Sequence, residues 1–147
     1  MEKPDRERIF AKLDEMTGYV EELKEMLPEE EEYSQNLIKR RACEKTIEVA
    51  IESLIDVSAM MVSAQRFGLP ASEESILDIL VEKKVLGKEL GERLKDMKGF
   101  RNILIHRYAH VDDKIVYQHM TDYLVDFFEF GKAIESYIGK SKCACDE

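Results

Sequence analysis

Four polar side chains in one short stretch could together cleave a phosphodiester: Arg101, Asn102, His106 and Tyr108. At 3.6 residues per helical turn, Asn102 and His106 share one face, and Arg101 and Tyr108 share the adjacent face. RNA carries its own nucleophile, the ribose 2′-hydroxyl, so an enzyme must supply a proton carrier and positive charge at the phosphate. We expect His106 to move protons and Arg101 to stabilise the phosphorane, leaving a 2′,3′-cyclic phosphate without a metal.

Positive charge is concentrated around these residues. The chain has a net charge of −9, but residues 83–107 hold eight basic and three acidic side chains and stand at +5. Lys98 and Arg107 belong to this segment, and we expect both to contact substrate. A solvated helix face with a chance bias, and a helix-end hydrogen-bond network in place of a catalytic pair, would explain the same residues. The overall acidity argues against a protein that coats nucleic acid non-specifically.

Two groups of residues could bind a metal, and neither is convincing. His106 and His110 are four residues apart and would share a face if the helix continued through both, with Asp112 and Asp113 nearby. A firm third ligand is missing from this group. The Cys-Ala-Cys sequence at 143–145 is low-specificity evidence for a soft-metal or redox site. We therefore predict no metal and no cofactor.

Helical segments must position these side chains, because apolar residues recur at steps of three and four and no stretch alternates like a strand. Five segments are predicted, at about 5–27, 33–67, 72–86, 88–108 and 112–138. Their short connections favour an all-α fold, an antiparallel up-and-down helical bundle of four long helices plus a short one.

Capping residues predict where several of these helices begin and end. Asp5, Ser72 and Asp112 are expected N-caps, and Pro28 and Gly139 are expected to end helices. The prediction is a single bundle domain over residues 1–138 followed by a flexible tail at 139–147.

Length and composition set outer limits on the class of protein. The 147 residues suit one domain, and the hydrophobic fraction of 44% supplies a core. No apolar stretch approaches 18 residues, and the charged start is unlike a signal peptide, so we expect no membrane span. Three cysteines make no disulfide framework, which favours a cytoplasmic protein.

The segment 99–108, Gly-Phe-Arg-Asn-Ile-Leu-Ile-His-Arg-Tyr, resembles the signature of HEPN domains, Arg-x4-His-x-Tyr with a polar residue after the arginine. It is most similar to the HepT-like branch of ribonuclease toxins. Residues 40–52, 84–90 and 112–117 resemble the corresponding parts of that branch. The resemblance thus extends over roughly residues 5–138.

This resemblance implies a bundle that forms a homodimer, with two motif helices meeting in one basic cleft. It implies that Arg101 and His106 are catalytic and that Asn102 orients or assists them. It also implies an RNA substrate and a partner, the nucleotidyltransferase antitoxin of a toxin–antitoxin pair. Tyr108 matches the tyrosine that this partner adenylylates and would also contact substrate. A two-fold axis would supply each catalytic group twice.

Two other classes of function remain open from the sequence. In the first, the chain is a non-catalytic module whose motif helix holds a nucleotidyltransferase subunit or a nucleotide, so that Arg101→Ala weakens complex formation. In the second, the chain is only a dimeric structural bundle, which the polar motif face makes less attractive.

Overall fold

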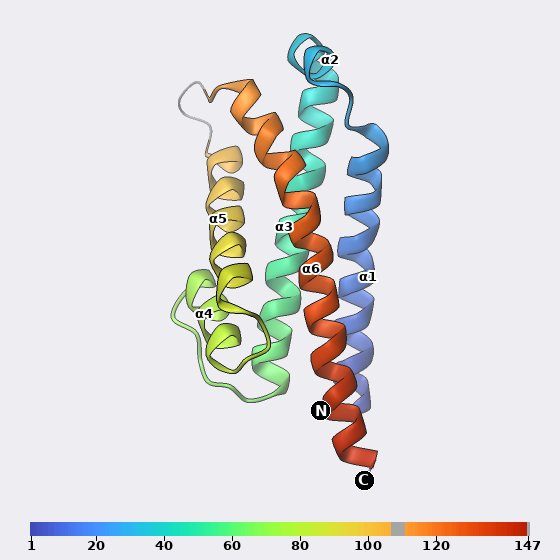
Figure 1. Ribbon diagram of the computed structural model, residues 1–147, viewed down its shortest axis with the longest axis vertical. Coiled ribbons are helices and arrows are strands. Elements are labelled where there is room, and N and C mark those ends of the chain that lie inside the picture. The colour runs from blue at the N-terminus through green and yellow to red at the C-terminus, as the bar shows by residue number, and fades with distance from the viewer. Residues whose placement is uncertain (107–110, 147) are drawn as a thin grey trace.

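The computed structural model describes residues 1–106 and 111–146, with side chains described up to residue 140. Six α-helices follow one another: α1 (Lys3–Met26), α2 (Glu30–Gln35), α3 (Leu37–Ala64), α4 (Glu73–Glu82), α5 (Lys88–Ile105) and α6 (Asp113–Asp146). Helices α1, α3, α5 and α6 run up, down, up and down beside one another (Figure 1). The predicted all-α antiparallel bundle is confirmed, with two short helices where one was expected.

Two of the predicted helix starts are confirmed by their hydrogen bonds. Ser72 caps α4 in a reciprocal capping box: its Oγ accepts from the Ser75 N–H at 3.1 Å, and the Ser75 Oγ accepts from the Ser72 N–H at 2.8 Å. Asp112 caps α6, since its Oδ1 accepts a hydrogen bond from the Lys114 N–H at 2.9 Å. These caps fix where the chain enters the two helices on either side of α5.

Other predicted boundaries were wrong. Helix α1 begins at Lys3 without a side-chain cap, because Pro4 in its first turn has no N–H to satisfy, and Asp5 lies inside the helix. The single helix expected at 33–67 is two, because the Asn36 side chain accepts from a backbone N–H and starts α3 there.

The last two long helices also end elsewhere than expected. Helix α5 ends at Ile105, with His106 as its C-cap, before the predicted end at residue 108. Helix α6 continues past Gly139 to Asp146, because a single glycine weakens a helix without breaking it. The division of the chain at residue 138 stays a prediction.

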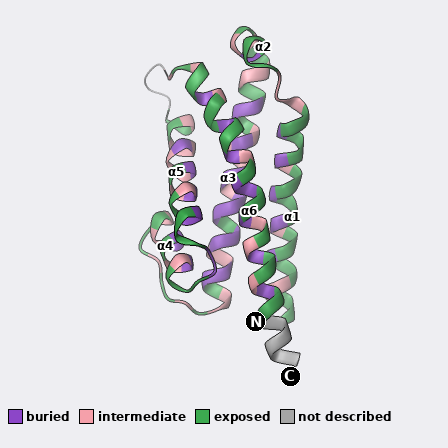
Figure 2. Ribbon diagram, in the orientation of Figure 1, coloured by how far each residue is buried: buried purple, intermediate pink, exposed green. Residues whose placement is uncertain are grey.

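The core lies where the inner faces of the four long helices meet. Buried residues line the facing sides of these helices and leave the outer sides exposed (Figure 2). Large, fully buried side chains come from helices far apart in the sequence, among them Ile9, Leu23, Leu54, Phe127 and Phe130. Such a core fixes the position of α5 against α3 and α6. A site at the end of α5 depends on that fixed position.

A glycine sets the distance between α4 and α5. A Cβ built on Gly91 of α5 would lie 2.4 Å from Cγ2 of Val81 on α4. Valine is stiff about χ1, so this methyl group has little freedom to move aside. Any larger residue at position 91 would therefore push α4 away from α5.

We predict that Gly91→Ala lowers the free energy of unfolding by about 1–2 kcal/mol, because overpacking outweighs the gain in helix propensity. Chemical denaturation measures the change. Gly131→Ala is the matched control, since nothing lies within 4 Å of a Cβ there, and it should stabilise by about 0.5–1 kcal/mol. Adding Val81→Ala should relieve part of the Gly91→Ala loss. Equal stabilisation by both glycine substitutions would contradict this account of the helix spacing.

Candidate active site

Helix α5 carries the candidate site on a firmly buried scaffold. Its inward residues Leu90, Leu94, Met97 and Phe100 fall at steps of three and four, and all are buried. Burial of this stripe fixes the rotation of α5 about its axis. The polar residues that follow Phe100 are thereby presented at the last turn of the helix.

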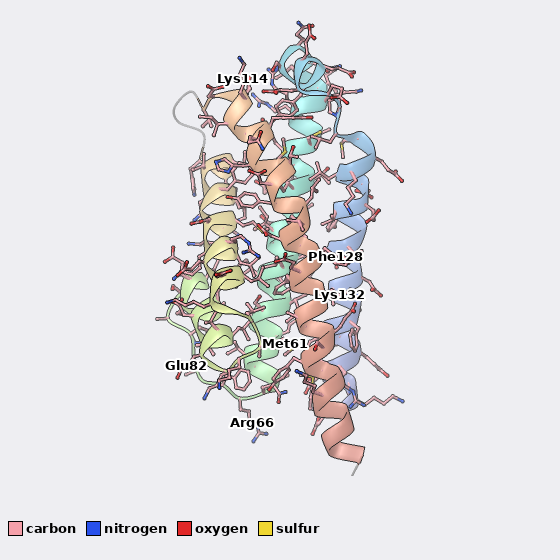
Figure 3. The ribbon with its side chains drawn as sticks, viewed as in Figure 1. Met61, Arg66, Glu82, Lys114, Phe128 and Lys132 are labelled. Carbon is pink, nitrogen blue, oxygen red and sulfur yellow. The ribbon has the colours of Figure 1, made fainter. Side chains whose placement is uncertain are left out.

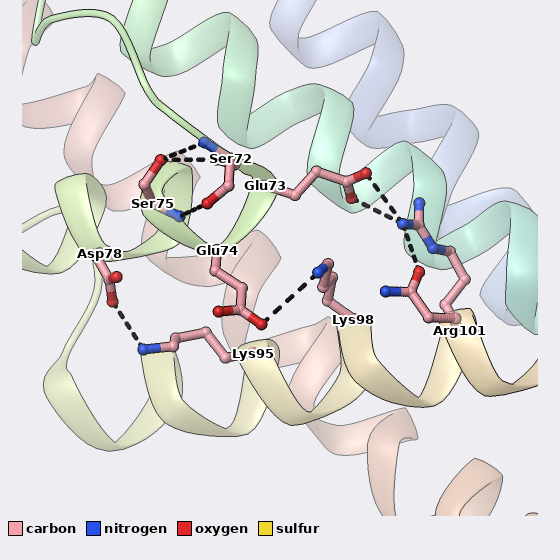
Figure 4. Close-up of polar contacts among 9 residues, drawn as sticks. Ser72, Glu73, Glu74, Ser75, Asp78, Lys95, Lys98 and Arg101 are labelled. Atoms are coloured by element: carbon pink, nitrogen blue, oxygen red, sulfur yellow. Dashed lines mark hydrogen bonds and ion pairs between the residues drawn. The ribbon is translucent and has the colours of Figure 1, made fainter.

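Arg101 lies against α4 with its side chain only 11% exposed. Its Nη2 donates to both carboxylate oxygens of Glu73, at 3.1 Å and 2.9 Å. The same nitrogen donates to Oδ1 of Asn102 at 3.0 Å (Figure 4). Among the described residues no acceptor meets the buried Nε of Arg101. The guanidinium is therefore tethered through one nitrogen, and its charge is balanced by one carboxylate.

Asn102 and His106 complete the last turn of α5. The Asn102 carbonyl accepts a hydrogen bond from the backbone N–H of His106 at 3.0 Å. His106 is exposed, whereas Asn102 is half-buried. The structure thus brings Arg101 and Asn102 into direct contact and places His106 one helical turn further along, at the surface, where an imidazole can exchange protons with a ligand or solvent.

A row of ion pairs joins α4 to α5 on this side of the bundle. Beyond the Arg101–Glu73 pair, Lys98 lies 3.7 Å from Glu74, and Lys95 lies 3.0 Å from Asp78 (Figure 4). The hydrogen bond that Lys95 donates to the Asp78 carboxylate raises the pKa of Lys95 above its usual value. Part of the basic excess predicted as an anion site is therefore neutralised by α4.

A fourth cation of α5 is also paired, with carboxylates of α6 instead of α4. Arg93 donates from Nε to Oδ1 of Asp126 at 2.8 Å and pairs with Glu129 as well, both on α6. The bond to Asp126, which is buried, raises the pKa of Arg93. This contact holds α5 to α6 and serves the fold more directly than the site.

Glu73 is the site residue that the sequence did not reveal. Glu73 and Glu74 after Ser72 indicated only acidic residues at the start of a helix. Nothing in the spacing connects Glu73 with Arg101, which is 28 residues away. The packing of α4 against α5 brings the two side chains together.

Three residues named in the sequence lie outside the described part of the structure. Arg107 and Tyr108, expected to contact substrate, and His110, a member of the zinc alternative, fall within residues 107–110. Their expected roles stay predictions. In the described residues, no three His, Cys, Asp or Glu side chains group as metal ligands. In the same part of the chain, no helix combines the length and apolar character of a membrane span.

Sequence comparison identifies the family. A family model described as ribonuclease HepT-like matches residues 16–134, and the chain belongs to this HepT-like family. A proposed RNase from Archaeoglobus fulgidus is 33% identical over 91 residues, which cover 62% of this chain and 68% of that protein. An mRNA nuclease, HepT, from Shewanella oneidensis is 22% identical over 128 residues, covering 87% of this chain and 96% of that one.

Solved structures share the fold. The tri-AMPylated HEPN toxin of Shewanella oneidensis, determined in complex with an MNT antitoxin, superposes with a TM-score of 0.83 at 21% identity, covering 92% of this chain and 99% of that one. The cytosolic protein YutE of Bacillus subtilis, of unknown function, gives a TM-score of 0.80 at 24% identity, covering 93% and 92%. At these identities the likeness establishes the helical architecture.

The two ion pairs at the ends of the α4–α5 row should differ in strength. We expect a double-mutant cycle on Arg101→Ala and Glu73→Ala to give a coupling of roughly 1–2 kcal/mol in unfolding free energy, because this guanidinium is largely shielded from water. The exposed Lys95–Asp78 pair, measured in the same way, should couple less. A smaller coupling for Arg101 and Glu73 than for the exposed pair would show that the tether is not a specific contact.

Proposed function

We propose that the chain is a metal-independent endoribonuclease, the toxin of a toxin–antitoxin pair that acts in the cytoplasm. The observation that supports it most is the placement of Arg101 and Asn102, in contact with each other, one turn before an exposed His106 at the end of α5. Membership of the HepT-like family supports the same activity.

Each residue has a distinct role in the proposed reaction. His106 accepts the proton of the ribose 2′-hydroxyl and donates a proton to the leaving 5′-oxygen. Arg101 balances the negative charge that develops on the phosphorane. Asn102 holds the guanidinium through Oδ1, which restricts its orientation. Lys98 is half-buried beside them and adds positive potential for the RNA backbone.

A homodimer would complete this site. Ile103 and Ile105 of the motif helix are 51% and 44% exposed, and Ile115 at the start of α6 is 53% exposed. Large apolar side chains left in water on one end of a bundle are typical of a covered surface. Pairing through this end would place two copies of Arg101 and His106 close to one two-fold axis.

The partner that restrains this toxin is a nucleotidyltransferase antitoxin. The structural neighbour from Shewanella oneidensis is AMPylated and bound to such an antitoxin. In this chain Tyr108 is the proposed acceptor of adenylyl groups, two residues beyond His106. Phosphates attached there would add negative charge beside the catalytic pair and repel RNA.

The non-catalytic module remains the second candidate, and one observation favours it. In the isolated chain Arg101 is 11% exposed and already neutralised by Glu73, so its charge is not freely available. Under this alternative the motif end binds the nucleotidyltransferase or a nucleotide and leaves RNA intact.

The catalytic assignment predicts cleavage of RNA in the presence of EDTA and a loss of about 10²–10⁴-fold in rate for His106→Ala, because the proton carrier is removed. A gel assay with end-labelled RNA measures the rate. His119→Ala is the matched control: His119 is also exposed but stacks on Tyr123 of α6, with ring centroids 5.6 Å apart, and should keep full activity. Full activity in His106→Ala would refute the assignment.

The dimer predicts that Ile103→Glu yields a monomer with little nuclease activity, because a charge cannot be buried unpaired at the interface. Light scattering after gel filtration measures the mass. Phe128→Glu is the control, since Phe128 is 62% exposed on another flank of α6, beside Lys132 (Figure 3). An unchanged mass for Ile103→Glu, or a monomeric wild-type chain with full activity, would exclude this interface.

A further inference from the structure

The carboxylate of Glu73 sits where an RNA phosphate would need to bind Arg101. Carboxylate and phosphate groups use the same kind of contact with a guanidinium, through oxygens that accept its N–H bonds. Both Glu73 oxygens lie within 3.1 Å of the Arg101 Nη2. An incoming phosphate would therefore meet a guanidinium that already holds an anion.

The side chains of Arg101 and Glu73 differ in how far they are exposed to solvent. The Arg101 side chain is 11% exposed, whereas the Glu73 side chain is 40% exposed. The carboxylate of this pair is thus the more accessible partner to solvent. A ligand that uses the same Nη2 competes with Glu73 for it.

Glu73 can leave without unfolding the helix that carries it. The start of α4 is held by the reciprocal Ser72–Ser75 capping box, in which Glu73 takes no part. Glu73 is the first residue of α4, where the helix dipole stabilises a negative charge even after the ion pair opens. The cost of releasing the carboxylate is therefore mainly the Arg101 contact itself.

Arg101 stays tethered when Glu73 leaves. Oδ1 of Asn102 accepts from the same Nη2 at 3.0 Å, and this amide carries no charge. The Nε is buried and has no acceptor among the described residues, so it adds no second anion to the guanidinium. The guanidinium is thus ready to receive a second anion with its full positive charge.

We propose that Glu73 is an internal counter-ion that occupies the phosphate position of Arg101 in the free protein and is displaced by a phosphodiester of RNA. This inference rests on the proposed function in taking RNA as the ligand. It adds a residue on α4 that controls how strongly the site holds a phosphate. The carboxylate restrains binding, and the restraint disappears when its charge is removed.

The test uses a single-stranded RNA in which every 2′-hydroxyl is methylated, so that it binds but lacks the nucleophile for cleavage. Glu73→Gln keeps a side-chain oxygen that can accept from Nη2 and removes only the charge. We expect Glu73→Gln to bind this RNA roughly three- to tenfold more tightly than wild type, as measured by fluorescence anisotropy. The slope of log affinity against log salt should stay the same, since the phosphate contacts Arg101 in both complexes and only the cost of displacing the carboxylate differs.

Asp78→Asn is the matched control. It removes the same charge from the same helix and frees Lys95 in place of Arg101, and it should change neither the affinity nor the salt slope. Unchanged or weaker binding by Glu73→Gln, or equal tightening by both variants, would overturn the proposal. Thermal unfolding of each variant confirms that it is folded.

The two assays distinguish failure of the counter-ion proposal from failure of the proposed ribonuclease activity. If wild type cleaves unmodified RNA but Glu73→Gln does not tighten binding, the counter-ion proposal fails and the ribonuclease stands. If wild type never cleaves RNA but Glu73→Gln binds the methylated strand more tightly than Asp78→Asn does, the counter-ion proposal stands and the ribonuclease fails.

Discussion

A guanidinium that is nearly nine-tenths buried must have a negative partner, and this constraint shapes the end of the bundle around Arg101. Removing a charge from water is costly unless an opposite charge and hydrogen bonds replace the lost solvation. Glu73 supplies the charge and Asn102 a further acceptor. The short helix α4 is consequently both a structural brace for α5 and the source of the anion beside the candidate catalytic arginine.

Under the proposed function, the same constraint would account for how an acidic chain contacts RNA. Of the basic residues on α5, Arg93, Lys95, Lys98 and Arg101 are paired with carboxylates of α4 or α6. The field of the free protein is therefore weaker than the sequence suggests, which suits a net charge of −9. If a ligand replaces a carboxylate as proposed, positive charge would become available locally and not over the whole surface.

The sequence predicted the parts of this arrangement that are local. Apolar periodicity located the long helices, and Ser72 and Asp112 marked two helix starts, because caps and stripes act over a few residues. It missed Asn36 as a helix start and the continuation beyond Gly139, where one residue decides between competing local structures. It also missed Glu73, because the partner of a buried charge depends on how α4 packs against α5, which residue spacing does not reveal.

In the proposed reaction, Arg101 and His106 together promote attack by the RNA's own 2′-hydroxyl. Mass spectrometry of the fragment ends produced by the wild-type chain in EDTA tests it most directly. The account predicts 2′,3′-cyclic phosphates on one fragment and 5′-hydroxyls on the other. Fragments with 3′-hydroxyl and 5′-phosphate ends, or cutting of the fully 2′-O-methylated strand, would contradict it.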